Sequence, residues 1–165
     1  VSDWSSDVCS SDLALLALPY DVGRVETQVI YREGFHLAFH NATTLVDRDS
    51  FDFDALPDES LLLLEDGHCL RDHALAGCRL KNHKKIHTFG ANSLHMLLQM
   101  VDNDLGVTLV PDMALGLLNN THIDTIRLPI EEFYRDIGFA WRKGHSRQSI
   151  LNDVMSRLEP PEFKE

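Results

Sequence analysis

Short apolar runs alternate with amphipathic helical segments along this chain of 165 residues, and this alternation is what most constrains the fold. Residues 13–18, 61–64 and 107–110 are apolar runs that predict buried strands. The first run is continuous, which favours a strand of the parallel type. Apolar residues at helical spacing occupy residues 94–105 and 146–158. Strands that alternate with helices are typical of the α/β class, so we expect helices that cover a mixed sheet.

Weaker patterns predict the remaining strands. Residues 27–31 and 35–40 have the alternation of a hairpin that would turn at residues 32–34. Residues 122–128 and 134–142 are typical of two further strands.

The connecting segments carry predictions of their own. Residues 41–60 are polar and acidic, which predicts a solvated loop with one helical turn. Residues 79–85 predict a basic loop, and residues 86–89 a short strand. Pro111 predicts the start of a short helix that ends at Leu118.

Capping residues mark the helix boundaries. Asn92 or Ser93 is expected to cap the helix at residues 94–105, with Gly106 just past its end. The last helix is expected to bury the apolar residues Ile150, Leu151, Val154 and Leu158.

Composition excludes several classes of protein. The 26 Asp and Glu against 15 Lys and Arg give a net charge of −11, so this chain lacks the basic surface that binds nucleic acid or anionic membrane. No apolar run approaches the length of about 20 residues that spans a bilayer. Three cysteines do not make a disulfide framework. Phosphate-binding glycine loops, nucleophile elbows and catalytic carboxylate pairs are missing from the sequence, so we do not expect an enzyme.

Residues 1–12 form a Ser/Asp string without helical or strand periodicity, and they resemble translated sequencing adapter. We expect this leader to be disordered and non-native. Without its Cys9, two cysteines remain.

Those two cysteines lie in one predicted helix, for which Asp66 is the expected N-cap. Cys69 falls in the first turn, beside His68 and Arg71. Cations and helix N-termini favour the thiolate, so Cys69 is suited to nucleophilic attack. Cys78 has no such neighbours, and the asymmetry suggests an attacking and a resolving cysteine.

The spacing of the two cysteines limits how they could bond. Nine residues of intact helix separate their Cα atoms by about 13 Å, and a disulfide tolerates about 7 Å. If oxidation linked them, this helix would have to unwind or refold, and the bond would act as a conformational switch.

The segment resembles the redox motif of the peroxide-sensing LysR-type transcriptional regulators, the OxyR group. It reads Glu-Asp-Gly-His-Cys-Leu-Arg-Asp at residues 65–72, with Cys78 at the same spacing. The resemblance implies that Cys69 is the peroxidatic cysteine and Cys78 the resolving one. The residues that it implies around thiolate and peroxide are Gly67, His68, Arg71, Asp72 and Arg142.

The resemblance extends over nearly all of residues 13–158. Residues 91–94 and 106–111 resemble the effector-domain core of LysR-type regulators, in which a helix N-terminus, here at Asn92 and Ser93, faces a ligand cleft.

The fold implied is the type II periplasmic-binding-protein-like fold of LysR effector domains. Its second lobe would be complete at residues 25–118. Residues 13–24 would end the first lobe and form the hinge, and residues 119–158 would return to the first lobe. Residues 1–12 and 159–165 would be leader and tail.

The function implied is that of a redox-sensing regulatory domain of a bacterial, cytoplasmic transcription activator, which responds to hydrogen peroxide through a reversible Cys69–Cys78 disulfide. The full-length protein would form dimers or tetramers and would alone contact DNA and RNA polymerase. Cellular thiols would reduce the disulfide again, and no cofactor or membrane is implied.

Two alternatives stay open. The chain could be a LysR-type effector domain that binds a small organic inducer, with non-redox cysteines. It could also be a thiol peroxidase that uses the same cysteine pair. A metal site is not expected, because the local His and Cys spacing fits no zinc template. The residues concerned are His68, Cys69, His73, Cys78, His83 and His87.

Overall fold

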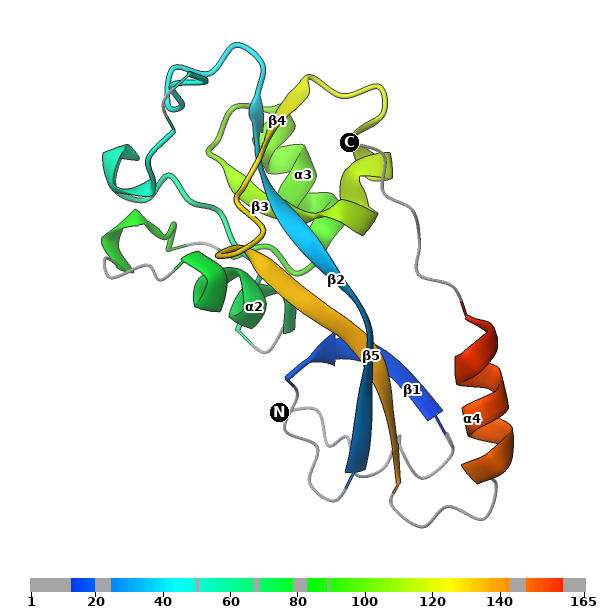
Figure 1. Cartoon of the computed structure of the whole chain (residues 1–165). Coiled ribbons are helices and arrows are strands. Elements are labelled where there is room, and N and C mark those ends of the chain that lie inside the picture. The colour runs from blue at the N-terminus through cyan, green and yellow to red at the C-terminus, as the bar shows by residue number, and fades with distance from the viewer. Residues whose placement is uncertain are drawn as a thin grey trace. The chain divides into compact units, whose positions relative to one another are not determined.

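The computed structural model describes residues 13–19, 25–49, 51–66, 69–78, 83–88, 90–142 and 148–158 (Figure 1). It confirms an α/β fold with a mixed sheet. The elements are β1 (Leu13–Leu18), β2 (Val25–His40), η1 (Phe53–Ala55), α2 (Cys69–Cys78), η2 (His83–Lys85), α3 (Leu94–Asp102), β3 (Thr108–Pro111), η3 (Asp112–Leu118), β4 (Ile123–Arg127), β5 (Tyr134–Arg142) and α4 (Gln148–Arg157).

The chain divides into two compact units. We call Gly34–Tyr134 the central unit, and Val1–Glu33 with Arg135–Glu165 the terminal unit. The expected leader and tail lie outside the described residues, and the lobe boundaries predicted from the sequence stay a prediction.

The sheet of the central unit is organised around β2. This strand pairs antiparallel with β3 on one side and with β4 on the other. Residues 61–64, predicted as a buried strand, are all buried but join the sheet through isolated parallel bridges. The bridges are Leu61 to Ile86, Leu61 to Val107 and Leu64 to Ala91. The strand predicted at residues 86–89 is therefore wrong, because in the described part of it only Ile86 takes part in a bridge.

Alternating side chains of β2 build two hydrophobic cores on opposite faces of this sheet. Phe35, Leu37 and Phe39 of β2 face the core that α2 covers, and Ala38 faces the core that α3 covers. The first core includes Phe35, Leu37, Phe39, Leu61, Leu63, Ala74, Val107 and Leu109. The second includes Ala38, Leu62, Leu64, Leu97, Leu98, Val101 and Val110.

The acidic segment at residues 41–60 contains the predicted helical turn, which is η1, capped by the Asp52 side chain. Its apolar residues attach it to the first core. Val46 and Leu56 are buried, and the ring of Phe53 stacks on Phe133 with 5.3 Å between ring centroids. The segment is therefore solvated only on its charged side.

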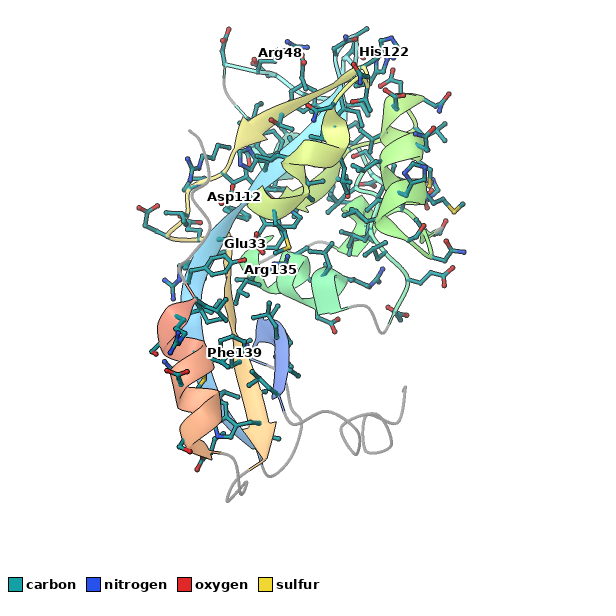
Figure 2. All side chains as sticks on the ribbon, turned by 90° about the vertical axis from the view of Figure 1, so that its right-hand side faces the viewer. Glu33, Arg48, Asp112, His122, Arg135 and Phe139 are labelled. Carbon is teal, nitrogen blue, oxygen red and sulfur yellow. The ribbon has the colours of Figure 1, made fainter. Side chains whose placement is uncertain are left out.

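The hairpin predicted around residues 32–34 is wrong, because β2 is one strand of 16 residues. Partners distant in sequence hold this stretch extended. Glu33 is buried and accepts a hydrogen bond from Arg135 of β5. Both residues are labelled in Figure 2. The backbone N–H of Gly34 donates to a carboxylate oxygen of Asp112 at 2.8 Å.

In the terminal unit, β5 lies between β1 and β2. The parallel pairing predicted for β1 is wrong, since β1 pairs antiparallel with β5, with Leu13 opposite Trp141. Leu15 is 62% exposed, so the continuous apolar run does not mark burial on both faces.

Helix α4 confirms the predicted last helix, but two of the four residues predicted on its inner face are exposed. Val154 and Leu158 are exposed, whereas Met155 packs against Phe139 and Trp141. The side chains of Ile150 and Leu151 lie outside the described residues, so the prediction for these two stays untested.

Helix α3 begins as predicted and ends earlier. Ser93 is its N-cap, and the Ser93 Oγ accepts a hydrogen bond from the backbone N–H of Met96. The helix ends at Asp102 with Asn103 as C-cap. Gly106 is required for another reason, because a Cβ there would lie 2.5 Å from the carbonyl oxygen of Ser60.

Replacing Gly106 by alanine should lower the free energy of unfolding by about 1–3 kcal/mol, because the new methyl group would collide with the Ser60 backbone. Urea denaturation followed by circular dichroism measures the loss. The matched control is Gly116→Ala, where a Cβ meets nothing within 4 Å, and its effect should stay below about 0.5 kcal/mol. Equal effects of the two substitutions would contradict the close-approach explanation.

Candidate functional site

Two helices begin at the same edge of the central sheet. Leu64 and Ala91 form a parallel bridge, so the segments that contain them run in the same direction. Helix α2 begins at Cys69, shortly after Leu64, and α3 begins at Leu94, shortly after Ala91. This edge is where α/β folds bind ligands.

Helix α2 starts at Cys69 and ends at Cys78, which confirms that Cys69 lies in the first turn. The helix is continuous over these ten residues, and Leu70, Ala74 and Leu75 pack against the first core. The two Cα atoms are therefore about 13 Å apart, too far for a disulfide. The side chains of both cysteines lie outside the described parts, as do Gly67 and His68.

Asp66 is not the N-cap that the sequence predicted. Because α2 begins at Cys69, Asp66 lies three residues before the helix. Its carboxylate forms an ion pair with Arg71, with 3.0 Å between Oδ1 and Nε.

Arg71 connects the start of α2 to the buried segment before it. Its side chain is 19% exposed, and its Nη1 donates to the carbonyl oxygen of Leu64 at 2.8 Å. Asp72 also lies in the first turn and is exposed, where a negative charge interacts favourably with the helix dipole. The structure thus places Arg71 and Asp72 beside the backbone of Cys69.

A pocket of about 420 Å³ opens next to this turn. Its lining is mostly polar and includes both charge signs. The lining residues are Glu65, Asp66, Arg71, Ile86, His87, Thr88 and Gly90. Gly90 keeps the two segments close, since a Cβ there would lie 3.1 Å from the backbone of Glu65. The pocket has the size of a small-molecule site.

Sequence reasoning missed the contribution of His87 and Thr88 to this pocket. The contact depends on the parallel bridges between residues 61–64 and 86–91, and such pairing leaves no local sequence signal.

Asn92 and Ser93 precede α3 and are exposed. The hydroxyl of Ser93 is engaged in capping the helix, which accounts for that residue without a ligand. That the two residues face a ligand stays a prediction.

Arg142 ends β5 in the terminal unit, and its side chain lies outside the described residues. Its predicted place in the peroxide pocket stays a prediction. Among the described residues, no group of three His, Cys, Asp or Glu side chains could hold a metal ion. No helix within the described ranges is long and apolar enough to cross a membrane.

Comparison with known proteins gives a family. The model of the LysR substrate binding domain matches residues 10–159. The chain is 33% identical to the HTH-type transcriptional regulator EstR of Acinetobacter baylyi, over 89% of this chain and 50% of that protein. It is 35% identical to a probable hydrogen peroxide-inducible genes activator of Mycobacterium avium, over 87% of this chain and 47% of that protein. The chain thus spans about half the length of these relatives.

A solved structure is also similar. The reduced form of the regulatory domain of OxyR2 from Vibrio vulnificus superimposes with a TM-score of 0.84 and 36% identity, over 92% of this chain and 74% of that chain.

Arg71→Met should lower the free energy of unfolding by about 1–3 kcal/mol, because the buried carbonyl of Leu64 loses a charged donor while the aliphatic stem remains. Asp66→Asn should cost less than about 1 kcal/mol, since the Asp66 side chain is 93% exposed. Urea denaturation gives both values, and hydrogen exchange of the α2 amides locates the loss. An equal loss in both variants would contradict the distinct role of the Leu64 contact.

Proposed function

The chain belongs to the LysR substrate binding domain family, and from this premise we propose that it is the redox-sensing regulatory domain of a transcription regulator that responds to hydrogen peroxide. Relatives named as hydrogen peroxide-inducible genes activators and the similar OxyR2 regulatory domain support the proposal. The motif at residues 65–72 with Cys78 supplies the chemistry.

In the first step, the Cys69 thiolate attacks one oxygen of hydrogen peroxide. A sulfur–oxygen bond forms, the oxygen–oxygen bond breaks, and the leaving hydroxide takes a proton to become water. Cys69 becomes a sulfenic acid. The N-terminal turn of α2 and the cationic Arg71 favour the thiolate form that this step needs.

In the second step, the Cys78 thiolate attacks the oxidised sulfur of Cys69. The disulfide forms as the sulfenic hydroxyl leaves, which becomes water after protonation. Two equivalents of a cellular thiol later return both cysteines to the reduced state and leave as a disulfide of their own.

The observation that carries the proposal is the placement of Cys69 and Cys78 at the two ends of one intact helix. The disulfide requires this helix to open, so the oxidised chain must differ in conformation from the reduced chain. A sensor needs such a difference, because a partner has to distinguish the two states.

The other parts of the proposal concern the full-length protein. We propose that it is a bacterial, cytoplasmic activator that binds DNA, contacts RNA polymerase and forms dimers or tetramers. Reduction by cellular thiols fits a reducing compartment. The chain would consume peroxide stoichiometrically, as a sensor and not as an enzyme.

A second candidate function is the binding of a small organic inducer in the pocket beside Arg71. The size of that pocket favours it. On this alternative the cysteines have no redox role.

A few equivalents of peroxide should lower the intact mass of the reduced chain by two units, and peptide mapping should link Cys69 to Cys78. Cys69→Ser should abolish the reaction at this site. Cys78→Ser should instead stop at the sulfenic acid, which dimedone traps. Free thiols at both positions after treatment would contradict the peroxide proposal and favour the inducer. Continuous peroxide consumption with a thiol donor would support a thiol peroxidase.

Gly77→Ala should shift the thiol–disulfide equilibrium about fivefold toward the dithiol. Alanine stabilises a helix by about 0.8–1 kcal/mol relative to glycine, and only the reduced chain keeps α2 intact. Equilibration with glutathione buffers measures the shift. Gly116→Ala, outside α2, is the control and should leave the equilibrium unchanged. An unshifted equilibrium in Gly77→Ala would contradict the unwinding of α2 on oxidation.

A further inference from the structure

The chain passes between its two units twice. It leaves the terminal unit after Glu33, within β2, and returns to it at Arg135, within β5. The two strands are neighbours in the sheet. The backbone therefore connects the two units only within β2 and within β5.

A buried ion pair joins β2 and β5 at the residues where each strand reaches the boundary of the terminal unit. Glu33 is fully buried and Arg135 is 8% exposed, and 2.5 Å separates their Oε1 and Nε atoms. Figure 2 labels both side chains, which meet between β2 and β5. Burial raises the pKa of the neighbouring Tyr31, and the charge of Glu33 raises it further whereas Arg135 lowers it.

A second ion pair follows at the adjacent positions with the opposite polarity. Arg32 donates to both carboxylate oxygens of Asp136, at 2.7 and 3.1 Å. Because consecutive strand residues point to opposite faces, one pair ties the two strands on each face of the sheet. The Arg32 side chain is 49% exposed, so this second pair is solvated.

In the central unit, further contacts hold the residues of β2 that follow Glu33. The backbone N–H of Phe35 donates to the carbonyl of Phe133 at 3.2 Å, which keeps the paired register. Asp112 accepts from the Gly34 N–H and also lies 2.8 Å from the Nε2 of His36.

The charges specify the register of the two strands. A shift of β5 by one residue in one direction would place Arg32 opposite Arg135. A shift in the other direction would place Glu33 opposite Asp136. Either slip sets like charges against each other, which is unfavourable.

Stability alone does not explain a buried ion pair. Desolvation offsets its Coulomb attraction, so an apolar pair of similar volume is often as stable. A charged pair at this position is better explained by conformational specificity.

We propose that the pairs Glu33–Arg135 and Arg32–Asp136 form a register lock, which holds β2 and β5 in one register at the end of the terminal unit. The proposal uses neither cysteine and is independent of the peroxide proposal.

Hydrogen exchange of the intact chain, with mass spectrometry, tests the lock. The double variant Glu33→Met with Arg135→Met should keep the urea midpoint of the parent. Its amides at residues 31–36 and 133–137 should nevertheless exchange about tenfold faster or more. Arg48→Gln is the control, because it removes a solvated ion pair to Asp124 and should leave these amides unchanged.

Slow exchange in the double methionine variant would overturn the lock. Faster exchange at all amides, in proportion to a lower urea midpoint, would overturn it too. The pair would then contribute to the stability of the whole chain and not specifically to the register of β2 and β5. If the double variant fails to fold, Asp136→Asn gives a second test at the solvated pair. It should speed exchange of the same two segments about twofold to threefold, and an unchanged rate there would refute the proposal.

Discussion

The pairing of β2 with three other strands is the constraint on which the rest of the structure depends. β2 pairs with β3 and β4 in the central unit and neighbours β5 in the sheet. Its alternating side chains define the core under α2 and the core under α3. Even a one-residue change of register would exchange those faces, and both helices would lose their packing surfaces.

Local signals were sufficient to predict much of the fold. The bounds of β5 and the place of Cys69 in the first turn of α2 agree with the sequence patterns, and Ser93 caps α3 as predicted. These features depend on residues close together in the chain, through strand alternation, helical spacing and capping. The errors in strand pairing involve distant partners. Arg135 and Asp112 hold β2 straight where a hairpin was predicted, and β1 found an antiparallel partner in β5.

The candidate site, too, was predicted from the sequence only where its residues are close together in the chain. The sequence motif located Arg71 and Asp72 beside Cys69, because all three lie within one helical turn. It gave no sign of His87 and Thr88, which reach the pocket only because residues 86–91 lie parallel to residues 61–64. The motif thus predicted the reactive helix, and tertiary pairing supplied the opposite wall of the pocket.

The shortness of α2 has a further consequence. Ten residues are too few for a helix to be stable by itself in water, so α2 persists through its contacts at Leu70, Ala74 and Leu75. Such an element opens by local fluctuation at a small free-energy cost, while the sheet beneath it stays folded. On the proposed chemistry, oxidation would then capture an open conformation that the reduced chain already samples, by conformational selection. The response time of the switch would be set by how often this one helix opens.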